Sequence, residues 1–226
     1  SVKGMKSHYR TLKELPRPFK DLKDPPEGLY FLGNLDFLNK PNIGIVGARE
    51  MQPCSRDWLE NEISPYIHYS KRVVVSGGAR GVDQQAHAIA LRNEIPTIVV
   101  LPCGFKNLYP KSLNGWANHS RVLFVSEYPP EQEMRRFHFY RRNRLIAALC
   151  DYLLVVEAKD KSGTMITAQY ATDQGVDLLV PPGAVVHPNF TGNNQLIFDG
   201  AQMIRGFNDL KALIPISSQQ QDSGRQ

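Results

Sequence analysis

Short apolar runs rich in β-branched residues dominate the chain, and longer segments with the composition of helices separate them. Near-continuous apolarity is typical of strands buried on both faces, because a strand with one solvated face alternates apolar and polar residues. The alternation of runs and helical segments predicts an α/β fold: a mostly parallel sheet with helices on both faces. The six runs cover residues 43–46, 73–76, 97–101, 122–125, 152–156 and 177–180. The helical segments cover residues 83–92, 143–149 and 165–174.

The chain divides by composition into three parts. Residues 1–40 are rich in Lys, Pro and Asp, and we expect a loose N-terminal lead-in, with residues 1–4 a remnant of an expression tag. Residues 41–216 contain all six apolar runs and are expected to form one Rossmann-like domain. Residues 217–226, SSQQQDSGRQ, are polar and low in complexity, which predicts a disordered tail.

Charge and cysteine content limit the classes of protein. The 226 residues include 27 Lys+Arg and 22 Asp+Glu, a net charge of +5 that favours an anionic partner. The 3 cysteines form no CxxC pair, which argues against a disulfide framework or a zinc site and suits a reducing compartment. Neither a signal peptide nor an apolar stretch long enough to span a bilayer is recognisable. We therefore expect a cytoplasmic protein with no membrane partner.

Three loops that follow apolar runs contain glycine, and two of them also carry an arginine. Glycines let a backbone approach an anion closely, and the free N–H groups at a helix start point toward it. Arginine adds planar donors that match phosphate oxygens. Each loop alone is also explained by ordinary turn geometry, but three at one predicted sheet edge indicate a composite phosphate site. The candidate residues are Gly47, Arg49, Ser76, Gly77, Arg80, Gly81, Ser162, Gly163 and Thr164.

These loops do not match the common nucleotide-binding motifs. None reads GxGxxG, so a dinucleotide cofactor is not indicated, and none reads GxxxxGK[ST], so NTP hydrolysis is not indicated either. Asp83 stands ahead of the predicted helix 84–92, where it either caps the helix or contacts a ligand. The sequence leaves both roles open.

Segment 134–144 interleaves basic and aromatic residues, with 5 arginines, 1 histidine and 3 aromatic residues in 11 positions. Cations neutralise phosphates and aromatic rings stack on unpaired bases, so this pattern favours binding of a single strand. As an alternative, the phenylalanines belong to the core and the arginines to a solvated rim. The candidates for base stacking are Phe137, Phe139 and Tyr140. Those for phosphate binding are Arg142, Asn143 and Arg144.

No arrangement of residues typical of catalysis or metal binding is apparent, and no cofactor is expected. His87 is interpreted as a packed histidine rather than a general base. Glu127 and Glu157 stand at strand ends, where they could act as acids of a hydrolase. We favour loop capping or pairing with nearby arginines for both. The chain is therefore predicted not to be an enzyme.

Taken together, these segments resemble the DprA/Smf family of bacterial DNA-processing proteins. The matching stretches follow the family's order over roughly residues 25–205, which is most of the chain. They are Gly44–Arg49, Val75–Asp83 with Ala86-His87, Tyr109-Pro110, Ser126–Pro130, Phe139–Ile146, Val156–Ala158, Ser162–Ala168, Pro182-Gly183, and Gly192–Ile197 with Gly200-Ala201.

The resemblance implies an extended Rossmann fold whose positively charged pocket holds single-stranded DNA. It further implies protection of the strand, its presentation to the RecA recombinase during natural transformation, a homodimer, and no catalytic turnover. Carried over position by position, the pocket falls on Gly47, Arg49, Ser76, Gly77, Arg80, Arg142, Asn143, Arg144, Ser162 and Gly163.

The sequence departs from the family pattern in several places. Ala48 stands where the family usually has Thr or Ser, Gly78 replaces a usual Leu, and Tyr140 replaces a common Pro. Neither the helical domain often found ahead of the family core nor the winged-helix-like domain often found after it is recognisable. Two alternatives share the fold: a phosphoribohydrolase-like enzyme, whose PGGxGTxxE stretch is not matched, and a nucleotide-sensing module.

Overall fold

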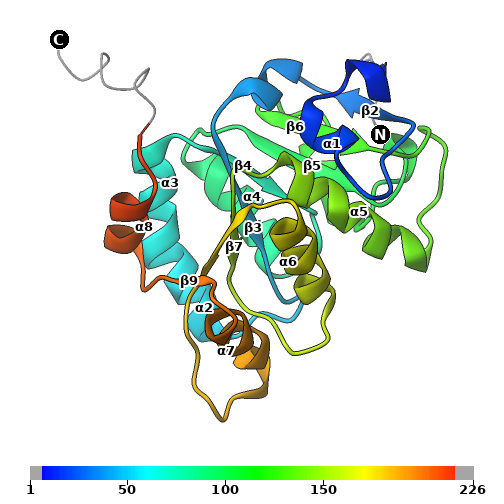
Figure 1. Cartoon of the computed structure of the whole chain (residues 1–226). Coiled ribbons are helices and arrows are strands. Elements are labelled where there is room, and N and C mark those ends of the chain that lie inside the picture. The colour runs from blue at the N-terminus through cyan, green and yellow to red at the C-terminus, as the bar shows by residue number, and fades with distance from the viewer. Residues whose placement is uncertain (1–6, 217–226) are drawn as a thin grey trace.

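The computed structural model describes residues 7–216, and within them nine strands form a single sheet (Figure 1). The strand order is β1-β2-β6-β5-β4-β3-β7-β8-β9. From β6 to β9 all neighbouring strands are parallel, whereas β1 and β2 add an antiparallel edge. The predicted Rossmann-like α/β class is therefore confirmed.

All six predicted strands are present, with ends shifted by at most one residue. Most of their residues are fully buried, as near-continuous apolarity predicts for strands covered on both faces. The strands are β3 (Asn42–Val46), β4 (Val73–Ser76), β5 (Thr97–Leu101), β6 (Val122–Ser126), β7 (Tyr152–Val155) and β8 (Asp177–Val180).

Residues 7–40 are not loose, which corrects our expectation for the described part of the lead-in. They form β1 (Ser7–Thr11), α1 (Arg17–Lys20) and β2 (Gly28–Leu32), and β2 pairs with β6. Phe19 and Phe31 are buried in the main core. Charged residues and prolines separate these apolar anchors in the sequence, so no periodic pattern marks them. The division of the chain at residue 40 stays a prediction, and residues 1–6 and 217–226 lie outside the described residues.

Two predicted helices are confirmed, and a third is longer than predicted. The confirmed pair is α4 (Val82–Arg92) and α6 (Gly163–Asp173), whereas α5 (Arg136–Leu149) begins well before Asn143. The helical stretch over residues 53–70 was not predicted. It comprises α2 (Pro53–Trp58), a π-helical turn (Leu59–Ile63) and α3 (Ser64–Ser70). The chain ends in a 3₁₀ turn (Pro188–Phe190), α7 (Thr191–Phe198), β9 (Gln202–Met203) and α8 (Phe207–Leu213), and short 3₁₀ segments also occur earlier in the chain.

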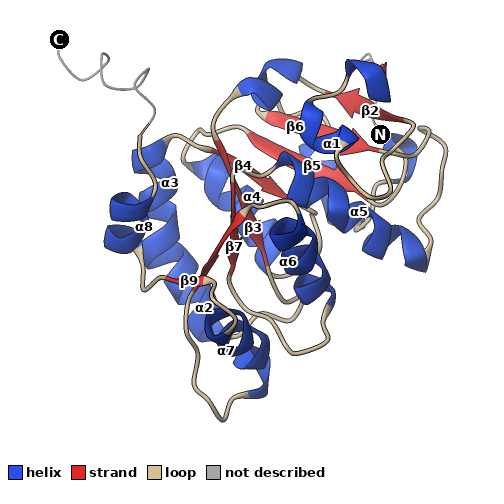
Figure 2. Cartoon of the chain, in the orientation of Figure 1, coloured by secondary structure: helices blue, strands red, loops and turns tan. Residues whose placement is uncertain are grey.

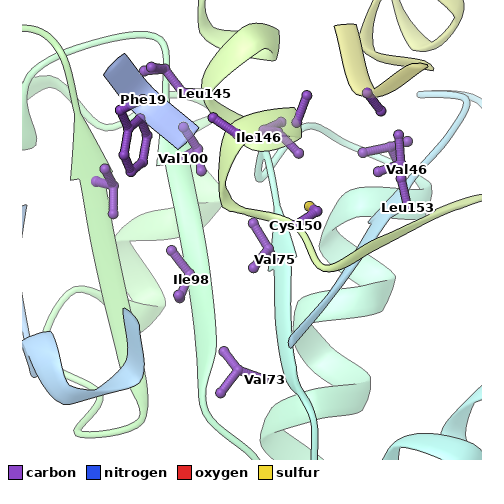
Figure 3. Close-up of a cluster of buried hydrophobic side chains, with 14 of the residues drawn as sticks. Phe19, Val46, Val73, Val75, Ile98, Val100, Leu145, Ile146, Cys150 and Leu153 are labelled. Carbon is purple, nitrogen blue, oxygen red and sulfur yellow. The ribbon is translucent and has the colours of Figure 1, made fainter. Parts of the chain in front are cut away.

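Helices cover both faces of the sheet (Figure 2). Val73 and Val75 face a core that includes residues of α1, α5 and α6, whereas Val74 faces one that includes residues of α3, α4 and α8. This separation follows from the two-residue period of a strand. In Figure 3, the valines of β4 lie beside Ile98 and Val100 of β5, with Leu145 and Ile146 of α5 nearby.

The parallel strands send their carboxyl ends to one edge of the sheet. Loops from β3, β4 and β7 lead there into α2, α4 and α6. This is the edge at which open α/β sheets bind ligands. None of the described helices combines the length and the apolarity needed to cross a lipid bilayer.

Candidate nucleic-acid interface

A cavity of ≈ 610 Å³ lies at the carboxyl ends of β3 and β7. Its walls come from four segments that are far apart in the sequence. These are residues 46–50 after β3, residues 79–83 at the start of α4, residues 134–146 in and before α5, and residues 158–167 around the start of α6. The loops predicted to share one sheet edge therefore meet there.

Cations outnumber carboxylates around this cavity. Four lining side chains are basic and two are acidic. The basic ones are Arg49, Arg136, Arg142 and Lys159, and the acidic ones are Glu50 and Asp83. Arg49, Arg136 and Lys159 are exposed, whereas Arg142 is 4% exposed. An anion that enters therefore meets three exposed cations and one buried cation.

Arg142 is anchored at the cavity by backbone carbonyls. Its Nη1 donates to the oxygens of Gly77 at 2.6 Å and Val100 at 2.5 Å, and its Nε donates to Asn143 Oδ1. Within residues 7–216, Nη2 has no hydrogen-bond partner. Burial lowers the pKa of Arg142 to about 10, so the guanidinium stays charged at neutral pH. It is a preorganised donor for an anion.

Asp83 organises the loop between β4 and α4. Its Oδ2 accepts from the N–H groups of Gly77 at 3.2 Å and Ala79 at 3.4 Å, so the carboxylate bonds back to the loop ahead of the helix. The N-cap of α4 is Gly81, so the capping role left open for Asp83 is wrong. Asp83 does line the cavity, and its contact with a ligand stays a prediction. Burial raises the pKa of Asp83 to about 6, while the nearby Arg142 charge opposes that shift.

The start of α6 forms another wall of the cavity. Ser162 precedes the helix, and Gly163 and Thr164 open it. Asn143 Nδ2 donates to the Gly163 carbonyl at 3.3 Å and so ties this start to α5. Ser162 Oγ is buried without a hydrogen-bond partner among the described residues. Together with the unpaired N–H groups of a first helical turn, this hydroxyl forms a polar end suited to an anion.

The aromatic residues of α5 divide between the cavity and its surroundings. Phe139 is half-buried, and the Arg49 guanidinium lies 4.6 Å from the centre of its ring. Tyr140 also lines the cavity and is exposed. Phe137 is 53% exposed but lies outside the cavity wall. The core alternative therefore does not describe Phe137, and Phe139 belongs to the cavity.

The structure brings together nine of the fifteen predicted site residues. Those that line the cavity are Gly47, Arg49, Phe139, Tyr140, Arg142, Asn143, Ser162, Gly163 and Thr164. Those outside the lining are Ser76, Gly77, Arg80, Gly81, Phe137 and Arg144.

Three residues outside the lining shape the loops instead. Ser76 Oγ is buried and donates to the Ile45 carbonyl at 2.6 Å, so this hydroxyl is occupied. A Cβ on Gly77 would lie 2.5 Å from Nη1 of Arg142, which leaves space only for glycine. Gly81 has φ +79° and abuts the carbonyl of Ala48, so it allows the loops after β3 and β4 to touch. Arg80 is exposed beyond the cavity wall.

Arg144 corrects the prediction that it binds phosphate. It is 2% exposed, and its Nη2 and Nη1 donate to the two carboxylate oxygens of Glu127 at 2.6 and 3.0 Å. Its Nε donates to the carbonyl of Asp24. Residues 142 and 144 are about 200° apart around a helix, so only Arg142 points into the cavity. The expected pairing of Glu127 with a nearby arginine is confirmed.

Two lining cations were not among the predicted site residues. Arg136 lies in the basic segment that was singled out, so the signal was present but its place on α5 was not predicted. Lys159 follows β7 and carries no motif of its own. Among residues 7–216, no three His, Cys, Asp or Glu side chains are grouped so that they could hold a metal ion.

The parallel sheet and the cavity at its carboxyl edge define a Rossmann-like α/β protein with a basic, anion-accepting site. The family model for DNA recombination-mediator protein A matches residues 7–215, and the chain belongs to this family. The resemblance to the DprA/Smf proteins is thereby confirmed. The DNA processing protein DprA of Bacillus subtilis (strain 168) is 34% identical over 206 residues, which cover 90% of this chain and 69% of that protein.

Solved structures of relatives share the fold. The X-ray structure of DprA from Streptococcus pneumoniae superposes with a TM-score of 0.85 at 32% identity, covering 95% of this chain and 76% of that one. DprA from Helicobacter pylori, in a structure described as showing its single-stranded DNA binding mode, has a TM-score of 0.79 at 32% identity. That match covers 90% of this chain and 94% of the other.

Proposed function

We propose that this chain binds single-stranded DNA through its phosphate backbone in the cavity at the carboxyl edge of the sheet. The observation that carries the proposal is the convergence of four cations and a helix start on one cavity with only two carboxylates. Membership of the DNA recombination-mediator family supports it, as does the single-stranded DNA binding mode described for the Helicobacter pylori relative.

Phosphate is the part of DNA that this site suits best. The exposed guanidinium of Arg49 and the free Nη2 of Arg142 are donors for phosphate oxygens. The first turn of α6 adds backbone N–H groups. Contacts of this kind hold a strand without reading its bases, so we expect binding that is nearly independent of sequence.

Preference for an unpaired strand follows from the aromatic rim. Phe139 and Tyr140 present rings at the cavity, and a base can stack on such a ring only when it is not paired in a duplex. Arg49 lies over the Phe139 ring, so the ring holds this phosphate donor at the cavity, and the exposed Tyr140 is the better candidate for stacking on a base.

The wider role in the proposal is that of a binding protein without turnover. It protects single strands, presents them to the RecA recombinase in transformation and recombination, and acts as a homodimer. We include these features in the proposal because the chain belongs to the DNA recombination-mediator family. Analytical ultracentrifugation of the protein alone, and then with RecA and a single strand, tests the dimer and the ternary complex.

Fluorescence anisotropy with a short oligo(dT) and a duplex of the same length tests the binding itself. We expect tighter binding of the single strand, with log K against log [salt] falling at a slope of about −3 for roughly four neutralised phosphates. Binding that prefers the duplex or ignores salt would contradict the proposal. Cleavage of added AMP to a free base would favour the phosphoribohydrolase-like alternative.

The Arg49→Ala variant extends the same experiment. It should weaken binding to all single-stranded sequences alike and make the salt slope less negative by about 0.7, the contribution of one phosphate contact. Arg121→Ala is the matched control, because Arg121 lies at the amino end of β6, at the opposite edge of the sheet. Its slope should equal that of the unaltered protein.

A further inference from the structure

Glu157 follows β7 and lines no part of the cavity. It nevertheless accepts hydrogen bonds from both ends of the loop 48–52, which carries Arg49. Its backbone carbonyl accepts from the N–H of Ala48 at 2.8 Å. Its Oε2 accepts from the N–H of Gln52 at 3.0 Å. The side chain is completely buried, so these bonds are shielded from water. One residue therefore brackets residues 48–52.

The second carboxylate oxygen of Glu157 reaches a distant segment. Oε1 accepts from Nδ2 of Asn189, which is itself buried in the 3₁₀ turn after β8. The carboxylate thus lies between two donors, a backbone N–H on one side and a side-chain amide on the other. Only a carboxylate offers an acceptor oxygen to each, because a glutamine would place its own NH₂ group against one of them.

A carboxylate at position 157 is electrostatically unfavourable near a site that binds phosphate. None of the ion pairs formed within residues 7–216 includes it. A buried negative charge beside a cavity for phosphate disfavours an anion there. A neutral side chain would avoid that repulsion, so the two accepted hydrogen bonds are the feature that requires a carboxylate at this position.

The chain around Asn189 also supports the loop that follows β7 and carries Lys159. Asn193, at the start of α7, donates from Nδ2 to the carbonyls of Val156 and Pro181, both at 3.0 Å. Its Oδ1 accepts from the N–H of Ala158 at 2.8 Å, one residue before Lys159. Residues 189–193 therefore form hydrogen bonds that support both the loop with Arg49 and the loop with Lys159.

We propose that Glu157, held in place by Asn189, is a positioning residue that sets Arg49 over the cavity for phosphate binding. This inference rests on the proposed function, because it assigns a role within that same site. It concerns a residue that touches no ligand and acts through the Ala48–Gln52 loop.

The Glu157→Gln variant tests the role by the same oligo(dT) titration over a range of salt. Loss of one acceptor frees the loop, so we expect binding about tenfold weaker and a salt slope less negative by about 0.7. Adding Asn189→Asp should restore both values. The new carboxylate at position 189 accepts from the amide NH₂ introduced at position 157, and the amide oxygen there then stays available to the N–H of Gln52.

A buried asparagine at the opposite edge separates positioning from general loss of stability. Asn42, at the start of β3, donates to the Leu149 carbonyl and accepts from the Asp151 N–H. The Asn42→Ala variant loses buried hydrogen bonds as Glu157→Gln does, but far from the cavity. It should lower the unfolding free energy and leave the salt slope unchanged.

Should Glu157→Gln not fold, Gln52→Pro carries the test. Gln52 has φ −67°, which suits proline, so the substitution removes mainly the N–H that donates to Glu157. We expect the same change of slope. Failure of the unaltered protein to bind oligo(dT) would refute the proposed function itself. Normal binding by the unaltered protein, with the same slope in the folded variant tested, would refute the positioning role, as would lack of rescue by Asn189→Asp.

Discussion

Asp83 and Arg142 place opposite buried charges beside each other at the cavity. The pKa of Asp83 is raised from its ordinary 3.8 to about 6, because burial outweighs the attraction of Arg142 and the two backbone N–H groups. The folded protein therefore holds this proton up to about pH 6, whereas the unfolded chain releases it near pH 4. Stability from this group is complete below pH 4 and is lost as the pH rises through 6.

The Asp83→Asn variant isolates this contribution. In the unaltered protein we expect the unfolding free energy to fall between pH 4 and pH 7 by up to ~3 kcal/mol relative to the variant, from about two pKa units at 1.36 kcal/mol each. Asparagine keeps one acceptor oxygen for Gly77 and Ala79, so the loop is retained. Urea denaturation at pH 4.5 and pH 7.5 measures the difference. An identical pH dependence in both proteins would show that Asp83 does not titrate there.

The N-terminal segment differs most from the prediction, because its composition predicted a loose lead-in and it forms ordered elements instead. Residues 7–40 supply two strands and a short helix, and Phe19 from that helix packs with Leu145 of α5 in the main core. Segments so short cannot persist alone, because three residues must be ordered for each first helical hydrogen bond. The core itself therefore stabilises them.

Replacing Phe19 tests whether this element belongs to the folded core. Phe19→Ala should lower the unfolding free energy by about 3–5 kcal/mol, the usual cost of removing a buried ring. Tyr9→Ala on β1 is the control, since Tyr9 is exposed and its loss should cost much less. Both are measured by urea denaturation. A small effect of Phe19→Ala would mean that the segment docks only weakly.

Helix α5 shows how one element serves two purposes. Two arginines of its basic segment lie on different sides of the helix: Arg142 lines the cavity, and Arg144 pairs with Glu127. Composition predicted a cluster of cations over the whole segment. The phase of the helix could not be derived from it, because the predicted start at Asn143 left out the first two turns.

At the scale of the whole molecule, the sheet divides the interior into cores that protect two thiols. Cys103 and Cys150 are buried and Cys54 is exposed. Burial raises the pKa of Cys103 to about 11 and also raises that of Cys150. The thiolate is the nucleophile that attacks a thiol reagent, so we expect both buried thiols to react only after the sheet opens.

Reaction with a disulfide reagent at pH 8 therefore counts thiols in each state. One of the 3 cysteines should react rapidly in the native protein, and all 3 should react after denaturation. Cys54→Ser is the control and should abolish the fast phase. Rapid reaction of a second thiol would indicate that part of the sheet opens easily.

Several features of the fold and site were predictable because they depend on local pattern. Continuous apolar runs predicted six strands, and helices between parallel strands place all carboxyl ends at one edge. The glycine loops that begin at Gly47 and Ser162 were therefore expected to meet, and they do. The helices over 53–70 were not predicted, and their packing against β3 and β4 appears only in the assembled core.

The sequence by itself determined the class of fold, the edge that carries the site and the excess of cations there. These follow from periodicity and chain order, which are local. Tertiary structure alone decided which cations face the cavity, and it brought Asn189 to Glu157 across 32 positions. Such contacts depend on how elements pack and on the phase of each helix. A linear pattern does not specify them, because side chains far apart in sequence become neighbours only when the sheet is assembled.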